Sequence, residues 1–279
     1  MPNKNKIFNI LENFGIDLYG FVPFSACVPA NRRLYDECRN IGIKTAVIFA
    51  VPYKTDQTHG DGYNMSAYAR VYDYHKKFTS LFDIIIPRLN ESFPDNTFNA
   101  FADHSPINEK LAASSAGLGV IGNNTLLITK KYGSFVFLGG IYTDLDIPCD
   151  VISPERCLDC GLCKYACPTG AIGEKSYDHT KCLSYISQKN AKTECEKVLL
   201  YKTKTVWGCD ICQNVCPLND KAQNTADSYF TGSFIKNLSY DFIEKMDNSE
   251  FLKYPFSWRK KQVILDNIAN ADKNNFHND

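Results

Sequence analysis

The chain has 279 residues, a length typical of one large domain or two of moderate size. Hydrophobic residues make up 44% of it, enough to bury a sizeable core, which excludes a disordered chain. Lys+Arg and Asp+Glu both number 31, so there is no global basic field of the kind that nonspecific nucleic-acid binders use. The longest apolar run, Ala46 to Val51, is far below the roughly 20 residues of a membrane span, and the first residues lack a signal-peptide core. We therefore expect a soluble cytoplasmic protein with no membrane partner.

Residues 1–148 have the pattern of a mixed α/β domain. The β-branched and aromatic run Lys44 to Tyr53 predicts a buried strand. From Tyr74 to Leu89, apolar residues recur at the spacing of one helix face, which predicts an amphipathic helix. Pro87 lies inside this pattern and is expected to kink or end the helix, because proline lacks the backbone N–H that the helix needs.

A second, shorter helix is predicted further along this domain. Ser105 and Pro106 form an N-cap followed by proline at the first helical position, and Gly117 stands where the helix would end. Two strands that pair with each other are expected next, over residues 125–129 and 134–143, joined by a turn.

Three glycines between this helix and these strands match a known nucleotide-binding pattern. Gly117, Gly119 and Gly122 have the G-x-G-x-x-G spacing of dinucleotide-binding folds. That fingerprint follows a strand and opens a helix, whereas these glycines follow a helix and precede a strand. We therefore reject a dinucleotide site and expect the glycines to allow tight turns and close approach to a large, flat group.

The character of the sequence changes after residue 148. Residues 149–220 read as short elements and loops around cysteines, and residues 221–279 become helical in pattern after a polar start. The predicted organisation is therefore an α/β domain over residues 1–148, a cysteine-rich domain over residues 149–220 and a helical segment over residues 221–279.

The cysteine spacing is the most specific signal in the chain. Ten of the twelve cysteines fall in the stretch from Cys149 to Cys216, in a chain with no export signal, which argues against disulfides. The first run is C-x2-C-x2-C-x3-C-P, the bacterial ferredoxin pattern whose fourth cysteine serves a second cluster. Zinc knuckles pair two C-x2-C units and do not need the third and fourth cysteines. The run consists of Cys157, Cys160, Cys163 and Cys167.

A second run, Cys209-x2-Cys212-x3-Cys216-Pro217, lacks a first cysteine, because Val206 stands at that place. The ferredoxin pairing rule gives one cluster to Cys157, Cys160, Cys163 and Cys216. Cys167, Cys209 and Cys212 hold the other and leave one coordination position open. Either Cys182 or Cys195 fills it from a distance or the iron is open to substrate, and the spacing does not decide between these.

The clusters imply a further redox cofactor. A two-cluster ferredoxin needs few residues beyond its cysteine runs, yet about 150 residues precede them here. Iron–sulfur cubes move single electrons and perform no bond chemistry on a stable organic substrate alone, so the first domain is expected to hold the group that does.

The sequence resembles the epoxyqueuosine reductase family, cobalamin-dependent iron–sulfur enzymes that complete queuosine biosynthesis in tRNA. The resemblance covers roughly residues 40–270. The blocks that carry it are Tyr68-Ala69-Arg70, Asp73-Tyr74-His75-Lys76, Asp103 to Lys110, Ala116 to Ile128, Gly133-Ser134-Phe135, Lys181 to Tyr185 and Gly208 to Pro217.

The resemblance implies roles for particular residues. It makes Cys182 the remote fourth ligand of the second cluster and Asp103 the proton donor to the substrate. It implies cobalamin bound between the first domain and the clusters, with no protein histidine on cobalt. The residues at positions where the family holds cobalamin are Thr125, Leu126, Leu127, Ile128, Leu138, Ser184 and Asp210.

The departures from the family concern the substrate. Members usually continue for about a hundred residues into helical repeats that grip tRNA, and this sequence resembles a short form with the first helix pair. Val120 and Asn123 replace the usual Trp and Lys near the pocket. The leading hypothesis is thus a monomeric epoxyqueuosine reductase-like oxidoreductase that uses an external low-potential electron donor and binds tRNA weakly. The alternatives are the same cofactors acting on a nucleoside, small epoxide or organohalide, and an electron-transfer protein without catalysis.

Overall fold

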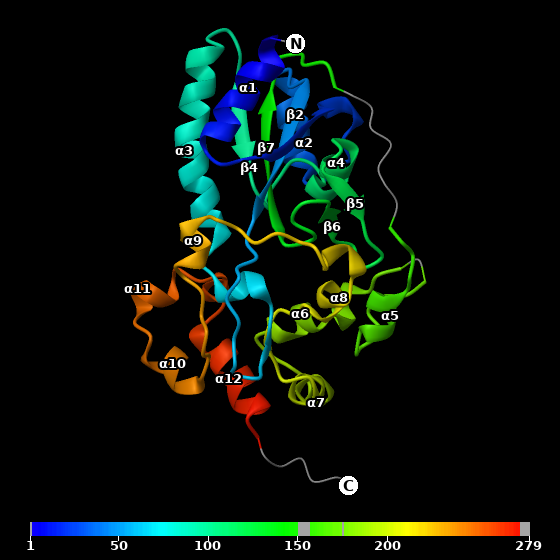
Figure 1. Ribbon diagram of the computed structural model, residues 1–279, viewed down its shortest axis with the longest axis vertical. Coiled ribbons are helices and arrows are strands. Elements are labelled where there is room, and N and C mark those ends of the chain that lie inside the picture. The colour runs from blue at the N-terminus through cyan, green and yellow to red at the C-terminus, as the bar shows by residue number, and fades with distance from the viewer. Residues whose placement is uncertain (1, 150–156, 175, 274–279) are drawn as a thin grey trace. The chain divides into compact units, whose positions relative to one another are not determined.

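The structure is a computed structural model that describes residues 2–149, 157–174 and 176–273 (Figure 1). None of the helices in these ranges combines the length and the apolar character that crossing a bilayer requires. The chain divides into two compact units, which are described separately below. The first unit comprises residues 1–52, 74–122 and 126–158, and the second comprises residues 53–73, 123–125 and 159–279.

The domain boundaries at residues 148 and 220 stay predictions. The two compact units are each made of several separate segments of the chain, so they do not coincide with the three consecutive domains that the sequence predicts. Residues 53–73, expected in the first domain, belong to the second unit. The predicted second and third domains fall almost entirely within that unit as well. The chain therefore passes between the units several times.

The first unit is built on a four-stranded antiparallel sheet in the order β1-β2-β7-β4 (Figure 1). Its strands are β1 (Leu18–Pro23), β2 (Thr45–Pro52), β4 (Phe98–Phe101) and β7 (Val136–Thr143), with a separate pair β5 (Gly119–Ile121) and β6 (Leu127–Thr129). Its helices are α1 (Pro2–Asn13), α2 (Arg32–Asn40), α3 (Tyr74–Ser92) and α4 (Glu109–Ser115).

Both faces of this sheet are covered by helices because β2 is apolar on both sides, which confirms the predicted strand. Ala46, Ile48 and Ala50 pack into one core cluster with residues of α2 and α4. On the opposite face, Phe49 stacks on Phe78 of α3 with their ring centroids 5.7 Å apart. Alternate residues of a strand point to opposite faces, so a continuous apolar run is what a sheet covered on both sides requires.

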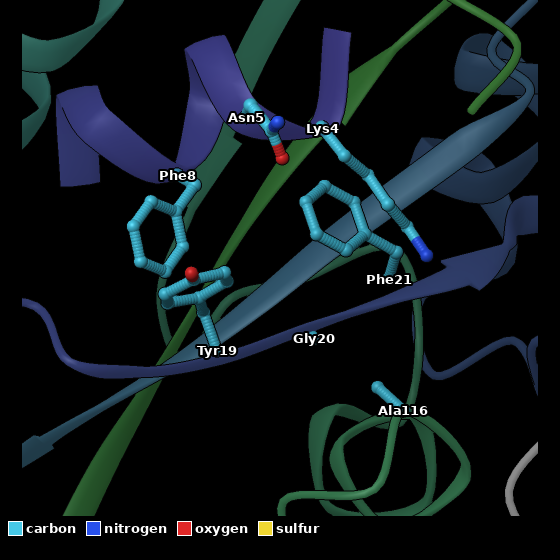
Figure 2. A pocket seen from close by; sticks show the side chains of 7 residues that line it. All are labelled: Lys4, Asn5, Phe8, Tyr19, Gly20, Phe21 and Ala116. Atoms are coloured by element: carbon cyan, nitrogen blue, oxygen red, sulfur yellow. The ribbon is translucent and has the colours of Figure 1, made fainter. Parts of the chain in front are cut away.

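Strand β1 forms one edge of the sheet, under helix α1. Figure 2 shows Phe8 of α1 close to Tyr19 of β1, and their rings meet edge to face with centroids 5.5 Å apart. Gly20 allows the strand to approach the end of α4, because a Cβ atom there would lie 2.3 Å from the Ala116 carbonyl oxygen. A pocket of about 270 Å³ remains between these elements.

The structure corrects three local predictions in this unit. Helix α3 does not end at Pro87 but runs on to Ser92, because the buried stripe of Phe78, Leu81, Ile85 and Leu89 holds it in place despite the lost hydrogen bond, while the expected kink stays a prediction. Helix α4 begins at Glu109 rather than near Pro106. Its N-cap is Asn108, whose side chain accepts the Leu111 N–H, and not Ser105.

The third correction concerns strand pairing. Strand β7 pairs with β2 and β4 and not with the segment 125–129, which makes only a single bridge inside the turn, between Thr129 and Gly133. Strand β6 pairs with β5 in antiparallel register, with Gly119 opposite Thr129. A Cβ atom on Gly119 would lie 2.2 Å from the Ile128 carbonyl oxygen. The close approach at this glycine is therefore made to a neighbouring strand, and the expected approach of the glycines to a flat group stays a prediction.

The second unit consists of short helices around a two-stranded parallel sheet, β3 (Asn64–Met65) and β8 (Thr205–Trp207). Its helices are α5 (Leu162–Ala166), α6 (Leu183–Ser187), α7 (Glu194–Lys202), α8 (Ile211–Asn214), α9 (Ser228–Thr231), α10 (Tyr240–Lys245), α11 (Asn248–Phe251) and α12 (Lys261–Ala271). The core of this unit forms around Trp207 of β8, which is fully buried.

Helix α12 packs against α6 and β8, the elements that lie between the two cysteine runs in the second unit. The buried Asn267 side chain donates to the carbonyl oxygens of Ser187 (2.7 Å) and Val206 (2.8 Å). Buried amides are stable only when hydrogen-bonded, so these contacts fix α12 against α6 and β8.

Candidate functional site

Apart from Cys157, the two cysteine runs lie in the second unit, where they fold into similar local structures. The first forms α5 and ends at Cys167, the C-cap, which is followed by a proline. The second forms α8, and Cys216 follows it, again before a proline. Helices α5 and α8 pack against each other. The sequence repeat is thus also a structural repeat, as expected for paired cluster-binding loops.

Four cysteines interact at one place in this unit. Burial raises the pKa of the Cys212 thiol to about 12, and the neighbouring Cys209, Cys182 and Cys167 contribute electrostatically to this rise. The Tyr177 hydroxyl is hydrogen-bonded to Cys182. These are the four cysteines assigned to the second cluster, and Cys182 is the remote one that the family resemblance selects.

The surroundings of these sulfurs suit thiolates that bind iron. Although burial raises the pKa of Cys167, hydrogen bonds from the Thr169 hydroxyl and from three backbone N–H groups lower it overall. Those N–H groups belong to Thr169, Ala171 and Ile172. Cys209 accepts a hydrogen bond from the Asn64 side chain at 3.5 Å. Hydrogen bonds to cluster sulfurs stabilise their negative charge and tune the reduction potential. The residues present therefore fit a [4Fe–4S] cluster.

Among the described residues, no three His, Cys, Asp or Glu side chains converge closely enough to hold a single metal ion. A cubane distributes its four thiolates over four irons, so its ligands stand further apart than those of one ion. Cys195, the other candidate ligand, is exposed on α7.

Three of the four cysteines assigned to the other cluster lie in the second unit, and the fourth lies in the first. Cys160 is exposed, and Cys163 and Cys216 are half-buried in the second unit. Cys157 is half-buried but belongs to the first unit, directly after residues 150–156, which lie outside the described residues. The assignment of Cys157, Cys160, Cys163 and Cys216 to one cluster stays a prediction.

Asp103 lies in the first unit, on the loop between β4 and α4. Its carboxylate Oδ2 is 3.4 Å from His75 Nε2 of α3, and both side chains are exposed. The hydrogen bond from His75 is the main reason why the pKa of Asp103 falls below its ordinary value. His75 lies in a block quoted for the family resemblance, but the sequence alone indicated no role for it.

The ring of Tyr74 extends this arrangement. It stacks on His75, with centroids 4.1 Å apart, and on Phe137 of β7, with centroids 4.2 Å apart. Stacking on a sheet residue restricts the orientation of Tyr74 and of the neighbouring imidazole. The geometry thus combines a carboxylate, an imidazole and an aromatic surface, a set that can exchange a proton with a bound molecule.

The residues assigned to cobalamin fall in both units. Leu126, Leu127, Ile128 and Leu138 belong to the first, whereas Thr125, Ser184 and Asp210 belong to the second. Leu126 and Leu138 are half-buried and leave apolar surface that suits a flat, largely apolar ring.

Two of these residues in the second unit have contacts of their own. The Asp210 carboxylate is buried and accepts the Ser66 hydroxyl (2.5 Å) and the Ala67 N–H (2.7 Å), so it anchors the segment that precedes Arg70. Thr125 has a left-handed backbone, with φ of 64°. Their roles as cofactor contacts stay predictions.

Comparison with known proteins agrees with this arrangement. The family model for the 4Fe-4S double cluster binding domain matches residues 156–219. The chain is 34% identical over 246 residues to the epoxyqueuosine reductase of Synechocystis sp., covering 86% of this chain and 76% of the relative. The chain belongs to the epoxyqueuosine reductase family. It is also 37% identical over 187 residues to the Gloeobacter violaceus epoxyqueuosine reductase, covering 65% of this chain and 58% of that protein. The aligned part spans just over half the length of several such relatives.

Solved epoxyqueuosine reductase structures share the fold. The Streptococcus thermophilus enzyme superposes with a TM-score of 0.82 at 24% identity, over 97% of this chain and 81% of that one. The Bacillus subtilis enzyme, solved with its catalytic aspartate loop swung out of the active site, gives 0.79 at 21% identity, over 96% and 80%. A complex with an epoxyqueuosine-modified tRNA-Tyr stem loop gives 0.76 at 21%, over 96% and 80%.

Proposed function

We propose that this chain is a cobalamin-dependent iron–sulfur reductase that converts epoxyqueuosine to queuosine in tRNA. The observation that carries the proposal is the meeting of Cys167, Cys182, Cys209 and Cys212 in a chain of this family. When bound, cobalamin would supply a low-valent metal centre able to reduce a carbon–oxygen bond, and the clusters would supply single electrons. The residues proposed to hold cobalamin are Thr125 to Ile128, Leu138 and Ser184.

In this proposal Asp103 delivers a proton to the departing oxygen. Removal of an epoxide oxygen as water consumes two electrons and two protons, so an acid beside the substrate lowers the barrier. The lowered pKa keeps Asp103 ionised at neutral pH when the site is open. A substrate that covers the exposed Asp103–His75 pair removes water from it, which raises the pKa of the carboxyl and favours its protonated form.

tRNA is the proposed carrier of the substrate, which would place the reaction in the cytoplasm. The basic residues near the chain end offer limited attraction, because several already serve the fold. Lys261 donates to the Met246 carbonyl oxygen at 2.5 Å, and Lys253 pairs with Glu250 at 2.6 Å. Arg259 stacks on Trp258, 3.7 Å from its ring centroid, and donates to the Gln188 carbonyl oxygen. We therefore propose weak binding, mostly through the modified nucleotide.

Anaerobic purification with iron analysis and cobalamin titration tests the cofactor part of the proposal. We expect about eight irons per chain and a cobalamin absorption band that changes on binding. The substrate part is tested by supplying the loaded protein with an epoxyqueuosine stem loop, the free nucleoside and a small epoxide. Preferential reduction of the stem loop supports the proposal. Reduction of only the small molecules, or of none with full cofactors, contradicts it.

A further inference from the structure

The proposed reaction needs more protons than Asp103 can hold. When an epoxide becomes an alkene, both carbon–oxygen bonds of the ring break and the oxygen leaves as water, which consumes two electrons and two protons. The external low-potential donor supplies the electrons. A carboxyl group carries one proton at a time, so Asp103 must be reprotonated within each turnover. Its lowered pKa makes the protonated form rare at neutral pH, so a neighbouring group has to bring the proton.

The imidazole of His75 lies beside the Asp103 carboxylate. His75 Nε2 is 3.4 Å from Asp103 Oδ2, and the side chains are 52% and 65% exposed. Imidazole takes up and releases a proton near neutral pH, which a carboxyl group or a lysine does not do without a large perturbation. His104, the residue after Asp103, has its Nε2 3.3 Å from the side-chain amide nitrogen of Asn31 instead. Of these two histidines, His75 is therefore the one at hydrogen-bonding distance from the carboxylate.

The orientation of His75 is set by the sheet of the first unit. Tyr74 stacks on the imidazole, with centroids 4.1 Å apart and planes at 29°. The same tyrosine ring stacks on Phe137 of β7, at 4.2 Å and 13°, and meets the buried Phe78 edge to face. Stacked aromatic pairs restrict the rotation of both rings. The aspartate on its loop thus meets an imidazole that the folded core holds in place.

We propose that His75 is a positioning and proton-relay residue that acts through Asp103. In the relay step the His75 Nε2–H bond breaks and an Asp103 Oδ2–H bond forms. Asp103 passes this proton to the departing oxygen, and water reprotonates His75 at its exposed part. Exclusion of water from the contact favours the transfer, because a neutral acid and a neutral imidazole are less costly to desolvate than an ion pair. The inference rests on the proposed function, in which Asp103 is the acid.

Two substitutions distinguish a relay from a simple contact. His75→Gln keeps an N–H donor but cannot carry a proton, and His75→Phe keeps an aromatic ring beside Tyr74 but has no donor. Proton transfer by a positioned side chain contributes about 100- to 10,000-fold, and water can replace part of it. We therefore expect kcat to fall at least about tenfold in both variants, with KM unchanged. His59→Gln is the control, because it removes another histidine–aspartate contact, with Nδ1 3.2 Å from Asp61 Oδ1 in the second unit.

The direction of the effect excludes a simpler role. If His75 only kept Asp103 ionised, its removal would raise the pKa of Asp103, increase the protonated fraction and speed turnover. The relay predicts a raised pKa together with slower turnover. Carboxyl ¹³C NMR of Asp103 measures this pKa in protein with filled clusters, before cobalamin or substrate is added. The titration should move upward in His75→Phe, because the hydrogen bond from His75 is the main cause of the lowered pKa. The other titratable groups near the pair in the first unit, Tyr74, Lys76, His104 and Glu109, are unchanged in this variant.

The relay and the proposed function fail in different ways. If the fully loaded wild-type protein forms no queuosine, the proposed function is wrong and the relay has no reaction to serve. If the wild type is active and both His75 variants turn over like His59→Gln, the relay alone is wrong. Normal turnover in His75→Gln with slow turnover in His75→Phe would also overturn it, since His75 would then only orient the carboxylate. Slow turnover in both, with the raised Asp103 pKa in His75→Phe, is the result that the relay predicts.

Discussion

The buried ion pair between Asp61 and Arg70 should govern the stability of the second unit. The side chains are 4% and 1% exposed, and the guanidinium donates to both carboxylate oxygens at 2.8 and 3.0 Å. Asp61 also accepts the backbone N–H groups of Tyr63 and Leu238. The pair therefore joins residues 53–73 to the C-terminal part of the second unit. Asp61→Ala would leave the buried Arg70 guanidinium without its carboxylate partner.

The expected loss is large relative to the stability of an ordinary domain. Removing one partner of a buried pair typically costs about 3–5 kcal/mol, against a total of roughly 5–15 kcal/mol. With a urea dependence of about 3 kcal/mol per M, a loss of about 4 kcal/mol lowers the unfolding midpoint by about 1.3 M. Asp241→Ala, which breaks the exposed Asp241–Lys245 pair of α10, is the control and should change the midpoint little.

Tryptophan fluorescence is a specific assay for this unit, because the two tryptophans of the chain, Trp207 and Trp258, both lie in it. Burial alone would raise the pKa of Asp61, but hydrogen bonds from Arg70 and from backbone N–H groups hold it below its ordinary value. The carboxylate thus stabilises the fold above its unfolded pKa of about 3.8, and this contribution is lost as the pH falls through the lower folded pKa. The midpoint difference should be full at pH 7 and shrink below about pH 4. Equal midpoints for Asp61→Ala and Asp241→Ala at pH 7 would refute the reasoning.

Three further outcomes are expected of the loaded protein. Cys182→Ala should lose about half of the iron, about four atoms of eight, whereas Cys195→Ala should keep all of it, and equal iron loss in both would exclude Cys182 as the ligand. Asp103→Asn should lower turnover at least about 100-fold while both clusters and cobalamin stay bound, so near-normal turnover would remove its role as the acid. The affinity for unmodified tRNA should be weak and should fall steeply with added salt. Nanomolar affinity at physiological salt would contradict this prediction, because it would require an RNA-binding surface that the charge distribution does not indicate.

Much of the site could be predicted because its signals are local in sequence. The cysteine spacing predicted two related cluster-binding runs, which the structure shows to contain the helices α5 and α8, and an apolar run predicted β2. The pairing of β6 could not be predicted in the same way. Strand β6 pairs with β5, and β7 pairs with β2. These pairings depend on how side chains pack in the folded protein, and a short turn between β6 and β7 does not by itself make those two strands pair.

The remaining differences also come from tertiary contacts. Ser105 has the sequence of a helix cap, but its hydroxyl is hydrogen-bonded to that of the buried Tyr142, and Asn108 caps α4 instead. The depressed pKa of Asp103 is caused mainly by a hydrogen bond from His75, which lies 28 residues earlier in the chain. No local pattern reveals that contact.

Single-turnover reduction with controlled cofactor loading is the most direct test of the central claim. Protein with both clusters filled would be given an epoxyqueuosine stem loop and a low-potential chemical reductant, with cobalamin added from zero to one equivalent. Mass spectrometry would count queuosine formed per chain. The account predicts product in proportion to bound cobalamin and none without it. Product without cobalamin, or none at full loading of all cofactors, would contradict it.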